Sequence, residues 1–185
     1  MEGIDLMVRE HEYITRMLKV VRRACMQIMN GRDINYDDFG QIIGFIREYA
    51  DKHHHNKEEK LLFTRMVEEG GDTAVKLVKH GMLVEHDLGR MYVRDLEDSL
   101  SRVKSGDNEA KVDVIANAIS YTHLLEKHFE KENNAAYTYA VRQLPEETLR
   151  KIDEECKAYE SESAKDHVQD RYIGILKELE NKYIK

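Results

Sequence analysis

Four histidines and two glutamates recur with the same order and spacing in the two halves of the chain. Each half has a lone histidine followed by a His-x-x-x-Glu motif, and His128 stands 74 residues after His54. The six residues are His11, His54, Glu58, His86, His128 and Glu132. Residues four apart on a helix share one face, so each His-x-x-x-Glu motif can hold one metal ion between its two side chains.

The sequence similarity extends beyond these motifs. The stretch from His54 to Phe63 matches the stretch from His128 to Tyr137 at His54/His128, Lys57/Lys131, Glu58/Glu132, Glu59/Asn133 and Phe63/Tyr137, of which Glu59/Asn133 and Phe63/Tyr137 are similar rather than identical. Both lone histidines also follow a glutamate and precede an acidic residue, as Glu10-His11-Glu12 and Glu85-His86-Asp87. We interpret the chain as a duplicated unit.

Four imidazoles and two carboxylates form a borderline nitrogen and oxygen donor set. Such a set suits iron, zinc, copper or manganese better than calcium or magnesium. Six ligands are too many for one tetrahedral zinc ion. If each carboxylate bridges, the set fits a pair of metal ions with positions left for water or a small ligand.

Apolar residues with helical periodicity predict the elements that carry these ligands. The expected helices cover residues 4–30, 36–69, 72–104 and 108–144. Gly31, Gly70-Gly71 and Ser105-Gly106-Asp107 separate them, and each candidate ligand lies on an apolar stripe. The predicted fold is therefore all-α, an up-down-up-down four-helix bundle with a C-terminal helical extension.

The number of residues between each histidine and the nearest turn tests this arrangement. His11 lies 19 residues before Asn30, and His54 lies 18 residues after Tyr36. The two histidines of the second half agree within two residues across their own turn. Residues equally far from a tight turn lie at one height in antiparallel helices. All six candidate ligands are therefore predicted to lie in one layer.

Two His/Glu pairs compete on the second helix. His54 and Glu58 are in line with apolar residues, whereas His55 and Glu59 follow the polar residues Asp51 and Arg47. We therefore predict that the first pair binds metal and that the second pair lies at a solvated edge. We also expect solvent-exposed side chains at His53, His80, Lys57 and Lys131, whereas the position of His123 stays open.

The bulk composition narrows the class of protein. The 185 residues carry a net charge of −7 and 35% charged residues, with one proline. The acidic balance argues against a nucleic-acid or anionic-membrane partner. Because the start of the chain lacks a signal-peptide pattern, no apolar run approaches the ~20 residues of a membrane span, and only two cysteines occur, we expect a cytoplasmic protein.

The apolar periodicity says less about the organisation of the C-terminal part of the chain. Residues 1–144 are expected to form the bundle domain. Residues 145–185 are highly charged with sparser apolar positions, which predicts one or two further helices. This extension either packs on the bundle or forms a homodimer contact.

The order of the motifs, with His-His-x-Lys-Glu-Glu and Glu-His-Asp-x-Gly-Arg around them, resembles the hemerythrin family, in its prokaryotic HHE cation-binding branch. The resemblance covers about residues 5–140. It implies two non-haem iron ions joined by a bridging oxo or hydroxo group and two carboxylates. Carried over by position, His11 and His54 would bind one iron, His86 and His128 the other, and Glu58 and Glu132 would bridge.

This chain departs from the oxygen-carrying members of that family on two helices. The third lacks their His-x-x-x-His pair, and the fourth has His128-x-x-x-Glu132 where they have His-x-x-x-x-Asp. The position four before His86 holds Met82, so a fifth histidine is missing from the expected place. His123, His55, Glu59, a tyrosine or water could replace it. The rival ferritin-like class is disfavoured, because none of the nine histidines has a glutamate three residues before it.

The resemblance implies a non-haem di-iron protein that binds or senses a small ligand such as O2, NO or peroxide. The alternatives are a di-iron enzyme with peroxidase-like, catalase-like or NO-reducing activity, and iron handling. Whether the protein is an enzyme stays open at this point. A third possibility is a structural bundle that binds metal only adventitiously.

Overall fold

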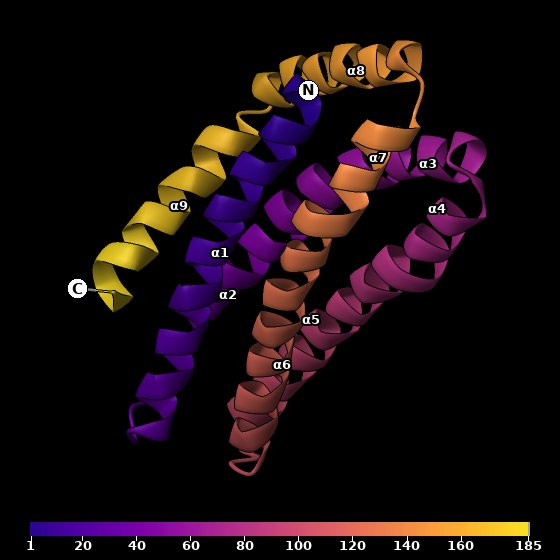
Figure 1. The fold of residues 1–185 in the computed structure, drawn as a ribbon. Coiled ribbons are helices and arrows are strands. Elements are labelled where there is room, and N and C mark those ends of the chain that lie inside the picture. The colour runs from indigo at the N-terminus through magenta and orange to yellow at the C-terminus, as the bar shows by residue number, and fades with distance from the viewer. Residues whose placement is uncertain (185) are drawn as a thin grey trace.

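The first long helix of the protein, α1 (Glu2–Met29), runs along most of the molecule (Figure 1). The structure is a computed structural model that describes residues 1–184. Gly31 follows α1 with a φ of 80°, a backbone conformation that suits glycine and turns the chain back. Asn35 then begins the next helix, and its side chain accepts a hydrogen bond from the Asp38 amide at 3.0 Å.

Each of the other three bundle helices contains at least one π-helical segment. In such a segment the backbone hydrogen bonds run from i to i+5, so the turn is wider than in an α-helix. The second helix consists of α2 (Tyr36–Phe45), η1 (Ile46–His55), η2 (Glu58–Phe63) and α3 (Thr64–Glu69). The third consists of α4 (Gly71–Leu77), η3 (Val78–Met82) and α5 (Leu83–Lys104), and the fourth of α6 (Ala110–Lys131), η4 (Glu132–Ala136) and α7 (Tyr137–Gln143).

Short turns connect these four helices, so consecutive helices run in opposite directions (Figure 1). Residues 1–184 contain helices and no strand. The predicted all-α, up-down-up-down four-helix bundle with a C-terminal helical extension is confirmed. None of the helices in this part of the chain is both long and apolar enough to cross a membrane.

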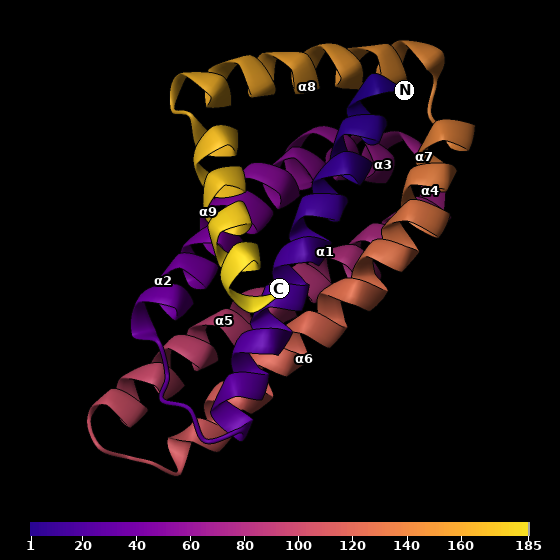
Figure 2. The ribbon, with the colours of Figure 1, turned by 90° about the vertical axis from the view of Figure 1, so that its left-hand side faces the viewer.

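The C-terminal extension folds onto the bundle as two helices. Helix α8 (Glu146–Lys165) crosses the end of the bundle where the N-terminus lies, and α9 (Val168–Tyr183) runs back beside α1 (Figure 2). Four residues of α9 are buried in the same apolar core as α1 and α2, namely Tyr172, Leu176, Leu179 and Tyr183. The outer faces of α1 and of the second bundle helix are therefore covered by α8 and α9.

Two apolar clusters fill the interior of the bundle. The larger one contains Ile14, Phe39 and Leu96, and the smaller one contains Met7, Phe63 and Met82. Along the first three bundle helices, the residues of the predicted metal layer fall between these two clusters in the sequence, and on the fourth only Phe129 of the larger cluster comes after His128. Apolar packing above and below therefore positions a polar layer inside the bundle.

Candidate metal centre

Seven buried side chains from all four bundle helices converge on one point of the interior. We call them the histidine–carboxylate cluster: His11, His54, His55, Glu58, His86, His128 and Glu132. They form two overlapping groups that share Glu58, and within each group the potential ligand atoms all lie within 4.8 Å of one another. One group is His11, His54, Glu58 and Glu132; the other is His55, Glu58, His86 and His128. The structure thus brings the six predicted residues together and adds His55.

Each of the two carboxylates reaches both groups. The Oε2 atom of Glu132 lies 3.2 Å from His11 Nε2, and its Oε1 atom lies 3.0 Å from His128 Nε2. The Oε2 atom of Glu58 lies 3.7 Å from His54 Nε2 and 3.5 Å from His86 Nε2. Both glutamates are therefore placed where a carboxylate can bridge two metal ions.

All five histidines direct Nε2 to the centre and Nδ1 outward. Each Nδ1–H donates to a side-chain oxygen, which fixes the tautomer and orients the ring. The pairs are His11 with Asn133 Oδ1 at 3.1 Å, His54 with Glu10 Oε2 at 2.8 Å, His55 with Asp51 Oδ1 at 3.3 Å, His86 with Glu59 Oε1 at 2.7 Å, and His128 with Glu85 Oε2 at 2.8 Å. This is the arrangement that metal-binding histidines adopt.

Several inward-facing atoms of the cluster have no hydrogen-bond partner. They are His54 Nε2, His55 Nε2, Glu58 Oε2 and both carboxylate oxygens of Glu132. Buried polar atoms are almost always satisfied, because leaving one unpaired costs ~1–3 kcal/mol. Burial and the neighbouring Glu132 carboxylate raise the pKa of Glu58 well above its usual value. A pair of metal ions would satisfy these atoms and offset the charge, so the residues fit such a pair.

The location of His55 corrects the sequence-based prediction. His55 is only 3% exposed, and its ring stacks on His86 with 3.8 Å between the centroids. Because η1 is π-helical up to His55, its wide turn lets His54 and His55 both face the centre. The predicted solvated edge is therefore wrong for His55. Of the candidates for the missing fifth histidine, His55 lies in the cluster, whereas His123 is exposed.

A statistical model of the hemerythrin HHE cation-binding domain matches residues 2–140. The chain belongs to this hemerythrin family. The matched range contains all seven residues of the histidine–carboxylate cluster. No curated protein and no solved structure gives a significant match.

Two other residues of this HHE domain differ from expectation. His53 and Lys57 were expected to be exposed, but they are 2% and 0% exposed. The reason is that α8 and α9 cover the outer face of the second bundle helix, which a bare four-helix bundle would leave in water. His80 and Lys131 are exposed, as predicted.

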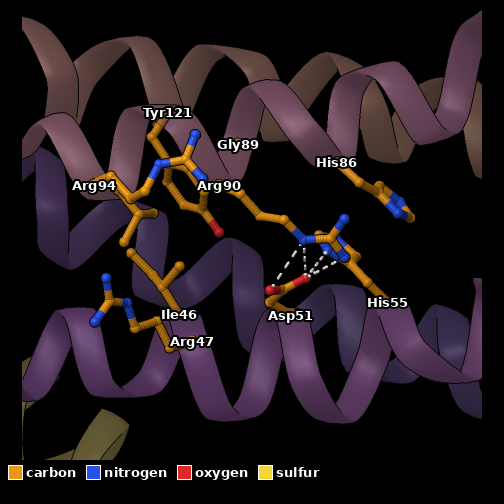
Figure 3. Close-up of a pocket in the computed structure, with 10 residues that line it drawn as sticks. Ile46, Arg47, Asp51, His55, His86, Gly89, Arg90, Arg94 and Tyr121 are labelled. Atoms are coloured by element: carbon orange, nitrogen blue, oxygen red, sulfur yellow. Dashed lines mark hydrogen bonds and ion pairs between the residues drawn. The ribbon is translucent and has the colours of Figure 1, made fainter.

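On the side of His55 and His86, the HHE domain has a cavity of about 230 Å³ between η1 and α5 (Figure 3). Arg90 reaches from α5 toward η1 and donates to Asp51 Oδ1 and to Glu59 Oε1, both at 2.7 Å (Figure 3). Burial opposes the ionisation of Asp51, but hydrogen bonds from His55 and Arg90 hold the pKa of Asp51 well below its usual range. The Arg90 guanidinium thus binds both Asp51, the partner of His55 Nδ1, and Glu59, the partner of His86 Nδ1.

On the side of His11, a second cavity of about 230 Å³ borders Tyr137 and Asn133. Apolar side chains of Ile4, Val8 and Val141 form much of its wall. The Tyr137 hydroxyl lies 3.4 Å from His11 Nε2 and donates to Glu58 Oε1. The Tyr137 side chain therefore both lines the cavity and contacts the histidine–carboxylate cluster.

Proposed function

We propose that the histidine–carboxylate cluster holds two iron ions and that the protein binds or senses a small ligand, O2, NO or hydrogen peroxide, at the group of His11 and His54. When bound, an iron pair in this donor set supplies redox change at each metal and an exchangeable coordination position. The observation that carries the proposal is the unequal number of histidines in the two groups.

Counting donors explains why one group has room for a ligand. The group of His55, His86 and His128 offers three imidazoles, and that of His11 and His54 offers two. If both glutamates bridge and an oxo or hydroxo group is shared, the first group completes an octahedral set. The second group then lacks one ligand, and a small molecule can take that position.

The side chains around His11 suit a small neutral ligand. Phe129 stacks on the His11 ring with 4.1 Å between the centroids and supplies no donor atom where the other group has His55. The neighbouring cavity is lined mainly by apolar side chains, which favour the entry of an uncharged molecule. The Tyr137 hydroxyl, which donates to Glu58 Oε1, lies 3.4 Å from His11 Nε2 and so borders this position.

The proposal is tested on protein expressed with ample iron. We expect about two irons per chain, and a spectral change on adding O2 or NO to the reduced protein that reverses when the ligand is removed. His54→Ala provides the control, because it should lose metal and this spectral change together. One zinc per chain, or no metal, contradicts the proposal.

A catalytic function is the second candidate, because the same open position could turn over its ligand. Repeated loss of hydrogen peroxide or NO over many turnovers would favour the enzyme. A stable, reversible adduct without turnover would favour binding or sensing.

A further inference from the structure

A second buried cluster of charged residues lies directly outside the histidine–carboxylate cluster. It contains Glu10 from α1, His53 and Lys57 from the second bundle helix, and Glu160 from α8. Lys57 is fully buried, and its ammonium group donates to Glu10 Oε1 and to Glu160 Oε1. His53 Nε2 lies 3.1 Å from Glu10 Oε1 and 3.3 Å from Glu160 Oε1.

This outer cluster already contains its own cation. Glu10, His53 and Glu160 are close enough to hold a metal ion. The ammonium group of Lys57, however, lies between the two carboxylates and 3.2 Å from His53 Nε2. An ion pair buried this deeply persists only when its hydrogen bonds are well satisfied. We therefore regard Lys57 as the resident cation of this cluster.

Glu10 connects the outer cluster to the proposed metal ligands. Its Oε1 atom accepts from Lys57, and its Oε2 atom accepts from His54 Nδ1 at 2.8 Å. A continuous chain of hydrogen bonds therefore runs from Glu160 through Lys57 and Glu10 to His54. Helix α8 also places the Tyr159 ring 5.7 Å from the Lys57 ammonium, and Gln169 of α9 donates to Glu160 Oε2.

The second half of the chain has an equivalent lysine–glutamate–histidine chain of hydrogen bonds, but α8 takes no part in it. There Lys131 donates to Glu85, and Glu85 accepts from His128. The Lys131 side chain is 49% exposed, whereas that of Lys57 is fully buried. Water can therefore replace Lys131 as a partner of Glu85, but Lys57 depends on Glu160.

We propose that Glu160 of α8 is a positioning residue of the metal centre, which holds Lys57 and Glu10 in place and so sets the orientation and donor strength of His54. This inference rests on the proposed function, because it concerns His54 as a metal ligand. It makes the C-terminal extension part of the metal centre as well as a cover for the bundle. Hydrogen-bond partners of metal ligands change metal affinity ~10–100-fold. Glu160 acts two residues further out than the direct partner Glu10, through Lys57.

The test compares Glu160→Gln with Glu155→Gln in the full chain loaded with iron. Glu155 also lies on α8, but its carboxylate accepts from Arg65 at 2.7 Å, whereas Glu160 accepts from Lys57. The measured quantity is the rate at which the two irons pass to a ferrous chelator after reduction. We expect two phases, of which the faster one is release from the group of His11 and His54. Glu160→Gln should accelerate this phase at least about threefold, below the range for a direct partner of a ligand. Glu155→Gln should leave both phases unchanged, and Glu160→Asp should fall between wild type and Glu160→Gln.

A second measurement reports on His54 without metal. The Nδ1–H proton of His54 should give a downfield, slowly exchanging NMR signal in the metal-free wild type, and Glu160→Gln should speed its exchange. If Glu160→Gln lowers the melting temperature but changes neither release nor exchange, α8 is only an anchor and the inference is wrong. The metal content of the wild-type protein is measured before any variant is made. If the wild type binds no iron, the proposed function is wrong, and this outcome is distinct from a failure of the inference about Glu160.

Discussion

The two halves of the histidine–carboxylate cluster are built on one duplicated pattern, yet they offer different ligands. The outer hydrogen bonds repeat between the halves. Glu10 holds His54 as Glu85 holds His128, and Glu59 holds His86 as Asn133 holds His11. The duplication has therefore kept the scaffold and the orientation of four histidines.

Three positions break this symmetry, and all three lie beside His11. The counterpart of His55 is Phe129, that of Glu59 is Asn133, and that of Phe63 is Tyr137. The changes remove an imidazole, replace a charged hydrogen-bond acceptor with a neutral amide, and add a hydroxyl group. Of these changes, His55/Phe129 alone alters the number of imidazoles, and it underlies the proposed difference between a full site and an open site.

His55→Phe should have the largest effect, because it removes a histidine from the fuller group. A phenyl ring occupies the equivalent position at Phe129, so the fold should tolerate it. We expect the iron held by His86 and His128 to leave to a chelator at least about 100-fold faster, above the effect of losing only an outer partner. Unchanged release would show that His55 is a buried residue and not a ligand.

Phe129→His is the converse change and should close the open position. A third imidazole beside His11 would have to be displaced before an added ligand could bind. We expect the affinity for azide, followed by its absorption band, to fall at least about tenfold, or ~1.4 kcal/mol. Two irons per chain with unaltered azide binding would place the open position elsewhere.

Asn133→Asp should have an intermediate effect. A carboxylate acceptor makes an imidazole a stronger donor than an amide does, so iron should leave the group of His11 about tenfold more slowly. Glu59→Gln is the matched change on the other side, and it should accelerate release from the group of His86 by a similar factor. If both variants moved release in the same direction, the outer acceptors would not account for the difference between the halves.

Tyr137→Phe should have the smallest effect and tests the added hydroxyl. The metal-free protein should lose ~1–3 kcal/mol in its free energy of unfolding by urea, because the fully buried Glu58 carboxyl group loses its hydrogen-bond donor. Tyr139→Phe is the control, since its hydroxyl binds the neutral Gly70 carbonyl at 2.7 Å and should contribute ~1 kcal/mol. A Tyr137→Phe variant more stable than the control would contradict this role.

Most of the fold and six of the seven cluster residues could be predicted from the sequence. Apolar periodicity and glycine turns determine the helices, and the repeated spacing identifies the layer. His55 was misplaced because the pattern assumed an α-helix where η1 is π-helical. The repeat contained a signal for it, since the equivalent Phe129 is a large apolar residue that would not be expected at a solvated edge.

The burial of Lys57 and His53 could not be predicted from the same pattern. Their position on the outer face of a bundle helix indicates exposure unless another element covers that face. The charged sequence of α8 did not show where it packs, because its ion pairs with the bundle join residues as far apart as Lys57 and Glu160. Such contacts depend on the tertiary structure alone.

The central claim is that the two halves hold two inequivalent irons. Mössbauer spectroscopy of the protein loaded with ⁵⁷Fe tests it most directly. We predict two quadrupole doublets of equal area, of which azide shifts only one, and more similar doublets that azide leaves unchanged in Phe129→His. One iron per chain, or a single doublet in the wild type that Phe129→His does not change, would contradict the claim.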